Sequence, residues 1–164
     1  DFYVASVMNH ILGGGGFTAR LYEEVREKRG LAYSVYSGLI SRDYGNLIWG
    51  GAGTANARVA ETLKVVRDEW RKRQSRGVTT RAVGAAKTYL TGSFPLRFSS
   101  SPRIAAILVG MQLDNLGIDY LDKRNSYIEA VTLDDVNRVA RDLLMPDKLT
   151  FVVVGEPEGV SSVE

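Results

Sequence analysis

The sequence contains no cysteine and only one histidine, His10. The lack of cysteine excludes disulfides and thiolate metal sites. A catalytic zinc ion commonly takes two or more histidine ligands, and neither HExxH nor HxxEH occurs in the sequence. We therefore expect no metal site within this chain, and we interpret His10 as a surface or partly buried helix residue.

Long apolar runs and an excess of one charge are also missing. No stretch approaches the ~20 apolar residues needed to cross a bilayer. Basic residues number 21 and acidic residues 19, a balance too even to favour nucleic-acid binding. The sequence thus predicts no membrane span and no nucleic-acid partner. It leaves the compartment open between bacterial cytoplasm, periplasm and mitochondrial matrix.

The composition that remains is that of a globular protein. Hydrophobic residues make up 45% and charged residues 24% of 164 residues, enough apolar material for a real core. The first residues, DFYVASVMNHIL, already have the apolar spacing of a helix interior. We expect residues 1–164 to form a single domain that is truncated at its N-terminus.

The periodicities predict roughly six helices and three strands. The strands are expected at 31–40, 46–54 and 149–155, the last being the buried run LTFVVVG. Because helices and strands are grouped and not alternating, the pattern favours an α+β fold, with an antiparallel sheet covered on one face by helices. Three strands are few for so many helices, so we expect the first strands of the sheet to be missing.

Local signals predict where the helices begin and which faces of the helices and of the first strand are apolar. Capping side chains are expected at Thr18, Asn56, Thr79, Ser101 and Thr132. Pro102 would occupy the first turn after Ser101, and Asp135 would complete a capping box with Thr132. The expected apolar faces are Leu31, Tyr33, Val35 and Leu39 in the first strand, Val59, Leu63, Val66 and Trp70 in the 56–74 helix, Ile104, Leu108 and Met111 after Ser101, and Val136, Ala140 and Leu143 after Thr132.

Four consecutive glycines, Gly13, Gly14, Gly15 and Gly16, separate the first helix from the second. They match neither GxxxxGK[ST] nor the dinucleotide pattern GxGxxG. The run is open to two interpretations. It is either a structural corner between helices, or a loop whose bare amides hold an anion or a peptide carbonyl.

Arg26 and Tyr33 are the candidate pair for chemistry. Arg26 lies near the end of the second helix, Gly30 reverses the chain, and Tyr33 follows in the first strand. A guanidinium and a phenol together offer donors to a peptide carbonyl or a developing oxyanion. No nucleophile, base or metal ligand accompanies them, so the residues alone indicate a binding or supporting pair.

Several segments resemble a known family. ILGGGGFTARLYEEVREKRGLAYSVYSG, residues 11–38, resembles the non-catalytic half of the pitrilysin-like zinc peptidases, the inverted zincins that include mitochondrial processing peptidase and insulin-degrading enzyme. FPLRFSSSPRIAAILV, YLDKRNSYIEAVTLDDVNRVARDLL and DKLTFVVVGEP resemble later segments of that half, in the same order. The resemblance covers nearly the whole chain.

The resemblance implies a peptide-binding domain or subunit of a zinc metalloendopeptidase. The catalytic partner would carry HxxEH and the zinc ion. By this resemblance Arg26 would hold a substrate carbonyl, Tyr33 would support the tetrahedral intermediate, and Gly13–Gly16 would contact peptide. The chain would therefore not cleave peptides alone.

Two further interpretations stay open. The same fold serves as a non-proteolytic scaffold in the core proteins of respiratory complexes, and an anion-binding module built on Gly13–Gly16 is the third. We also expect the isolated chain to dimerise. It would do so either by strand-edge pairing, because a sheet that lacks strands leaves an unpaired edge, or through the face that would meet the catalytic half.

Overall fold

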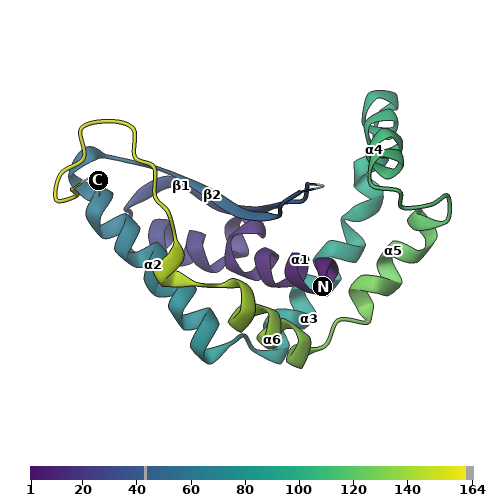
Figure 1. The fold of residues 1–164 in the computed structure, drawn as a ribbon, viewed down its shortest axis with the longest axis horizontal. Coiled ribbons are helices and arrows are strands. Elements are labelled where there is room, and N and C mark those ends of the chain that lie inside the picture. The colour runs from purple at the N-terminus through teal and green to yellow at the C-terminus, as the bar shows by residue number, and fades with distance from the viewer. Residues whose placement is uncertain (43, 162–164) are drawn as a thin grey trace.

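The structure is a computed structural model that describes residues 1–42 and 44–161. Its main elements, in chain order, are α1 (Phe2–Asn9), β1 (Ala32–Ile40), β2 (Leu47–Thr54), α2 (Val59–Arg76), α3 (Thr80–Gly92), α4 (Ser101–Leu113), α5 (Tyr120–Glu129) and α6 (Leu133–Leu143). Two π-helical turns, His10–Gly14 and Tyr22–Glu27, lie between α1 and β1. The hairpin of β1 and β2 lies above a layer of helices, while α4 projects upward on the right (Figure 1). The α+β class, with an antiparallel sheet covered on one face by helices, is confirmed.

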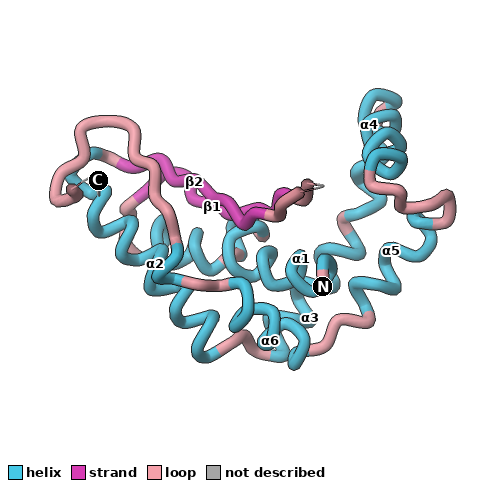
Figure 2. The backbone as a smooth tube through the Cα atoms, viewed as in Figure 1, coloured by secondary structure: helices cyan, strands magenta, loops and turns pink. Residues whose placement is uncertain are grey.

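The sheet of the described residues consists of two antiparallel strands, β1 and β2 (Figure 2). Their register contains a bulge near the start of β1. Ala32 pairs with Thr54 and Ser34 pairs with Gly53, so Tyr33 is the extra residue. The expectation that Tyr33 shares a face with Val35 is wrong. Tyr33 is 82% exposed and Val35 only 7%, because the bulge shifts the alternation of side chains at this point.

The core lies between the inner face of the sheet and the helices. Its fully buried side chains come from distant parts of the chain, including Val7, Leu12, Val25, Val136 and Ala140. A buried pair of polar residues joins α1 to β1: the Ser37 hydroxyl donates to Asn9 Oδ1 at 2.7 Å, and Asn9 Nδ2 donates back to the Ser37 carbonyl at 3.4 Å. The sheet is thereby fixed over the helix that leads into the glycines.

Two of the five expected caps are confirmed. The Thr79 hydroxyl accepts from the Ala82 amide at 3.2 Å. Thr132 and Asp135 form the expected capping box at the start of α6. Each bond lies within one helical turn, so local sequence is sufficient to specify it.

The other three caps are wrong. The Thr18 hydroxyl donates backward to the Gly15 carbonyl at 3.0 Å, and the Ala19 carbonyl accepts the bond that opens the next helix. Asn56 begins a 3-10 turn and makes no side-chain cap. Ser100, not Ser101, precedes α4, because the Ser100 carbonyl already accepts from Ile104.

The predicted faces of two helices are partly displaced. On α2 the buried side chains are Val59, Thr62, Val65, Glu69 and Trp70, so the buried face is rotated away from Leu63 and Val66. On α6, Val136 and Ala140 are buried as expected, whereas Leu143 is 43% exposed and Leu144 is buried in its place.

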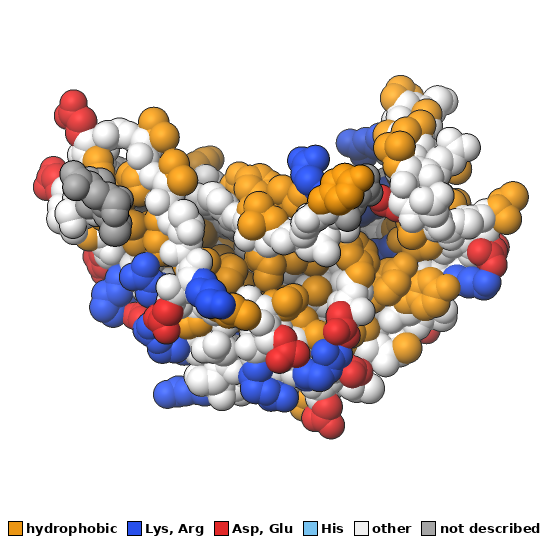
Figure 3. All heavy atoms as spheres, viewed as in Figure 1, with side chains coloured by type: hydrophobic (Ala, Val, Ile, Leu, Met, Phe, Trp, Pro, Cys, Tyr) orange, Lys and Arg blue, Asp and Glu red, His pale blue; other side chains and the backbone are white. Residues whose placement is uncertain are grey.

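Two predicted buried segments are exposed. No residue of α4 is buried, although Ile104, Leu108 and Met111 follow a helical spacing. Residues 149–155 do not form the expected strand, and Val152 and Val154 are 86% and 95% exposed. A β-prone run needs a neighbouring strand for its backbone hydrogen bonds, and this segment pairs with neither β1 nor β2. Figure 3 shows hydrophobic side chains gathered on the hollowed upper surface over the sheet and on α4.

Candidate functional site

The corner that joins the Tyr22–Glu27 turn to β1 brings Arg26 and Tyr33 together. Gly30 has φ +58°, a backbone conformation that glycine adopts without strain. Its amide donates to the Arg26 carbonyl at 2.9 Å, and the Leu31 amide donates to the Val25 carbonyl at 2.9 Å. These bonds end the helix and send the chain directly into the strand that carries Tyr33.

The Arg26 guanidinium lies between two aromatic rings. Its Cζ atom is 4.9 Å from the ring centroid of Tyr22 and 4.9 Å from that of Tyr33. Both distances fall within the ~6 Å range of a cation–π contact. Phe17 extends the stack, since its ring meets Tyr22 edge to face at 5.0 Å. We name Phe17, Tyr22, Arg26 and Tyr33 the aromatic–arginine ladder.

The ladder has exposed ends, and of its two middle members Tyr22 is buried and Arg26 is partly exposed. Phe17 and Tyr33 are 79% and 82% exposed, whereas Tyr22 is buried. Among the described residues Arg26 forms no ion pair with a carboxylate, so the stacked guanidinium keeps hydrogen-bond donors that no acid occupies. The ladder therefore presents a cation and a phenolic hydroxyl on a surface lined by aromatic rings.

Neighbouring charges are arranged differently. The Glu24 carboxylate is buried and accepts hydrogen bonds from Lys28 at 2.6 Å, Arg29 at 2.7 Å and Arg20 at 2.9 Å. The bond from Lys28, reinforced by the one from Arg29, lowers the pKa of Glu24 to about 2 against the effect of burial. The basic run around Arg26 is thus anchored on Glu24, and Arg26 is the member that faces the rings.

The glycine run is partly a packing feature. Gly13 is buried in the π-helical turn, and a Cβ atom there would come within 2.7 Å of the Ser37 amide nitrogen on β1. Close approach of the two backbones therefore accounts for glycine at this position. Gly14 and Gly16 are exposed, and a Cβ on Gly16 would meet nothing within 4 Å. Only the exposed part of Gly13–Gly16 is free to contact a ligand.

His10 is a buried packing residue. It is 8% exposed and stacks on the Tyr89 ring with centroids 4.8 Å apart. Burial lowers the pKa of the imidazole below its ordinary value. Within residues 1–42 and 44–161, no three His, Cys, Asp or Glu side chains lie close enough to share a metal ion.

Sequence reasoning missed Phe17 and Tyr22. Tyr22 precedes Arg26 by four residues, which places the two on one helical face, so this spacing was a usable signal. Phe17 had no such signal, because its contact with Tyr22 depends on the path of the loop between them.

None of the helices in the described part of the chain has the length and apolar character required to traverse a bilayer.

Comparison with known proteins identifies a family. Residues 1–90 match the family described as "Peptidase M16 inactive domain". The chain is 37% identical over 145 residues to an "uncharacterized zinc protease" of Streptomyces coelicolor, across 87% of this chain and 31% of that protein. It is also 30% identical over 162 residues to a "non-peptidase homolog" of Helicobacter pylori, across 94% of this chain and 35% of that protein.

Solved structures share the fold. A crystal structure of a peptidase M16 inactive domain from Pseudomonas fluorescens has a TM-score of 0.76 and 35% identity, over 90% of this chain and 35% of that chain. A chain of complex III from Candida albicans has a TM-score of 0.70 and 18% identity, over 86% of this chain and 36% of that chain. At this identity the second likeness concerns the fold alone. The present chain spans about a third of the length of the curated relatives it matches.

Proposed function

This chain belongs to the peptidase M16 family, as an inactive domain, and on this basis we propose that it binds peptide substrate for a catalytic half that carries zinc. The partner is a domain or subunit with HxxEH, and the zinc ion belongs to that partner. Residues 1–164 act as one non-catalytic unit of the peptidase. The observation that supports this proposal is the aromatic–arginine ladder, in which a guanidinium that pairs with no carboxylate of the described residues lies beside an exposed phenol.

Arg26 and Tyr33 have distinct roles in this proposal. The Arg26 guanidinium, held against the rings of Tyr22 and Tyr33, donates to a carbonyl of the peptide backbone. The Tyr33 hydroxyl donates to the oxyanion that forms when water attacks the scissile carbonyl at the partner's zinc. Phe17 and the exposed end of Gly13–Gly16 continue the same surface and contact the peptide farther from the cleavage point.

Reconstitution with the HxxEH half tests these roles. Tyr33→Phe is expected to lower kcat about 10²-fold, the usual effect of removing one oxyanion donor. Arg26→Ala is expected to lower kcat/KM, mainly through a higher KM. Tyr44→Phe is the matched control, since Tyr44 is fully exposed on the hairpin turn and should leave both constants unchanged. Unchanged kinetics in Tyr33→Phe and Arg26→Ala would remove the assignment.

A second function is a scaffold without proteolysis. It is favoured by the Helicobacter pylori relative, which is described as a non-peptidase homolog. The fold of the present chain also occurs in a chain of complex III. The two functions differ in their genetic context. A peptidase requires HxxEH elsewhere in the same gene or in a neighbouring one, whereas a scaffold requires no such motif.

A further inference from the structure

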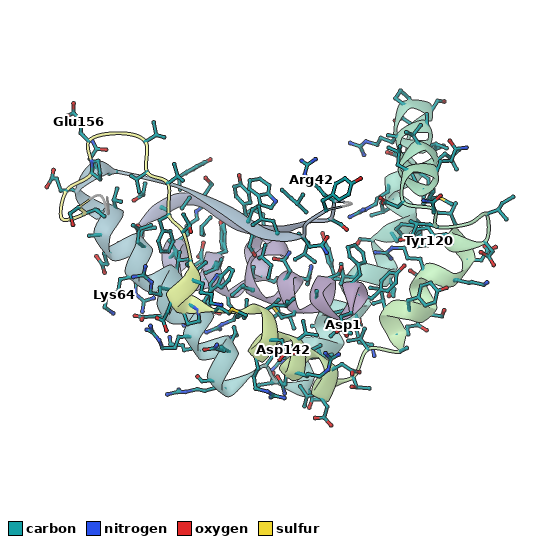
Figure 4. The ribbon with its side chains drawn as sticks, in the orientation of Figure 1. Asp1, Arg42, Lys64, Tyr120, Asp142 and Glu156 are labelled. Atoms are coloured by element: carbon teal, nitrogen blue, oxygen red, sulfur yellow. The ribbon has the colours of Figure 1, made fainter. Side chains whose placement is uncertain are left out.

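A cavity of about 360 Å³ lies where α1, α3, α5 and the hairpin meet. Its lining includes Leu39 of β1, Leu90 of α3 and Tyr120 of α5. Figure 4 labels Tyr120 at the start of α5, on the right of the view. No member of the aromatic–arginine ladder lines the cavity, so it is a second site.

Two guanidiniums line this cavity without a carboxylate. Arg124 is only 9% exposed, and its Nη1 atom donates to the Leu90 carbonyl and to Asn125 Oδ1, each at 3.1 Å. Its Cζ atom lies 4.0 Å from the ring centroid of Phe94. Arg97 also lines the cavity, and none of the described residues in its lining is Asp or Glu. All the partners of Arg124 are therefore neutral.

This arrangement leaves a buried positive charge incompletely compensated. Burial lowers the pKa of Arg124, and repulsion from Arg97 lowers it further. Two other partly buried arginines do have a buried carboxylate beside them, Glu24 beside Arg20 and Glu69 beside Arg73. A bound anion would supply the missing charge, and a carboxylate would accept hydrogen bonds from both guanidiniums.

Other groups of the cavity suit a small anionic group. The Tyr3 phenol also lines the cavity, and its hydroxyl carries a proton at neutral pH and can donate it to an anion; burial raises its pKa further. The lining also includes Asn9, whose side chain is bonded to Ser37, and His10, whose pKa is lowered by burial; neither side chain brings a negative charge. The volume is near the lower end for ligand pockets, which fits one side chain or one chain end.

We propose that this cavity binds a carboxylate group of the peptide substrate through Arg97 and Arg124. The identity of the ligand as a peptide rests on the proposed function. Both an acidic side chain and a C-terminal carboxylate have the required chemistry. The site would give the peptidase a preference for acidic peptides or for peptide ends, at a distance from the ladder.

Calorimetric titration of the 164-residue chain with three peptides tests this proposal. The probes are acetyl-Ala-Glu-Ala-amide, acetyl-Ala-Gln-Ala with a free carboxylate, and acetyl-Ala-Gln-Ala-amide. The neutral amide should bind at least tenfold more weakly than one or both of the others. Tighter binding of the first indicates an acidic side chain, and tighter binding of the second indicates a peptide terminus. Equal binding of all three would overturn the proposal.

Variants then locate the binding. Arg97→Gln should weaken binding of the favoured peptide about tenfold to a hundredfold, the range for losing a hydrogen bond to a charged group. Arg97 is exposed, so this variant is expected to fold. Arg103→Gln is the control, because this substitution removes the same charge. Arg103 is exposed on nearby α4 and does not line the cavity. Equal losses in both variants would show general charge attraction and would refute the site.

The two proposals fail separately. Carboxylate binding is measured without catalysis, so wild-type kinetics in Tyr33→Phe would remove the role of the ladder and leave the binding result intact. Conversely, if the three peptides bind alike while Tyr33→Phe lowers kcat, only the carboxylate site is lost.

Discussion

Glu24 shows how a single residue can organise the charges beside the ladder. Its side chain is 6% exposed and bonds with Lys28, Arg29 and Arg20. These partners stabilise the ionised form and lower its pKa to about 2 from an ordinary value of 4.5, Lys28 contributing most. The folded chain therefore binds a proton at Glu24 less readily than the unfolded chain does.

This difference predicts a pH-dependent stability. Glu24 stabilises the fold at pH values above 4.5, and the contribution is lost as the pH falls toward 2, because the carboxyl becomes protonated in both states. Glu24→Gln should therefore be less stable than the wild type at neutral pH, and the gap should shrink between pH 4.5 and 2. Urea denaturation of both proteins across this pH range measures the difference in their free energies of unfolding.

Glu27→Gln provides the comparison for this experiment. Glu27 is exposed and lies in the same π-helical turn. Its replacement should change the free energy of unfolding by less than ~0.5 kcal/mol at any pH. If the gap between wild type and Glu24→Gln stays constant from neutral to acidic pH, the ion network does not control stability in this way.

At this scale the sequence predicted the meeting of Arg26 with Tyr33 better than it predicted their surroundings. The corner between them is closed by short-range bonds, from the Gly30 and Leu31 amides to the carbonyls of Arg26 and Val25. The exposure of Tyr33 depends on a bulge opposite β2, and the burial of Glu24 depends on packing against other helices. Neither pairing nor packing between distant segments can be read from one short stretch.

The helix-to-strand corner at Gly30 is the element that positions the ladder. A Cβ atom at Gly30 would meet only Arg58 Nη1, at 3.8 Å, so space is available. The cost of a side chain there comes from the positive φ, and Gly30→Ala should destabilise the chain by about 1 kcal/mol. Gly84→Ala in α3 should instead stabilise it by ~0.5–1 kcal/mol, since that glycine is helical and has open space.

Urea denaturation of the two glycine variants separates backbone strain from loss of flexibility. Opposite signs support the role of the corner, and a stabilising effect at both positions would contradict it. Gly30→Asn offers a further check, because asparagine tolerates this conformation better than alanine and should cost less.

Among the elements, the sequence predicted those whose signals are local. The caps at Thr79 and Thr132 were correct because each forms within one turn of its own helix. The expectation of a buried strand at 149–155 was wrong because a strand is completed only by a neighbour. Helix α4 was mispredicted for the same reason. Its apolar spacing specifies an apolar face, but it does not specify another element that would cover this face.

The whole molecule combines two exposed features that favour self-association. The described sheet has only two strands, so the outer edge of each strand has no neighbouring strand to bond with. Residues 149–154 form an extended run with Val152 and Val154 almost fully exposed. An unpaired strand edge and a β-branched run together promote pairing between chains.

We therefore predict that the isolated chain dimerises through residues 149–154, and that a charge in this run prevents it. Val154→Lys should shift the chain toward monomer, because lysine on a strand edge opposes edge-to-edge pairing. Ile118→Lys is the matched control: Ile118 is 98% exposed between α4 and α5, and it adds the same charge outside the run. Size-exclusion chromatography with light scattering over a range of concentrations measures the shift. A wild-type chain that stays monomeric at the highest concentration, or equal effects of the two lysines, would contradict pairing through this segment.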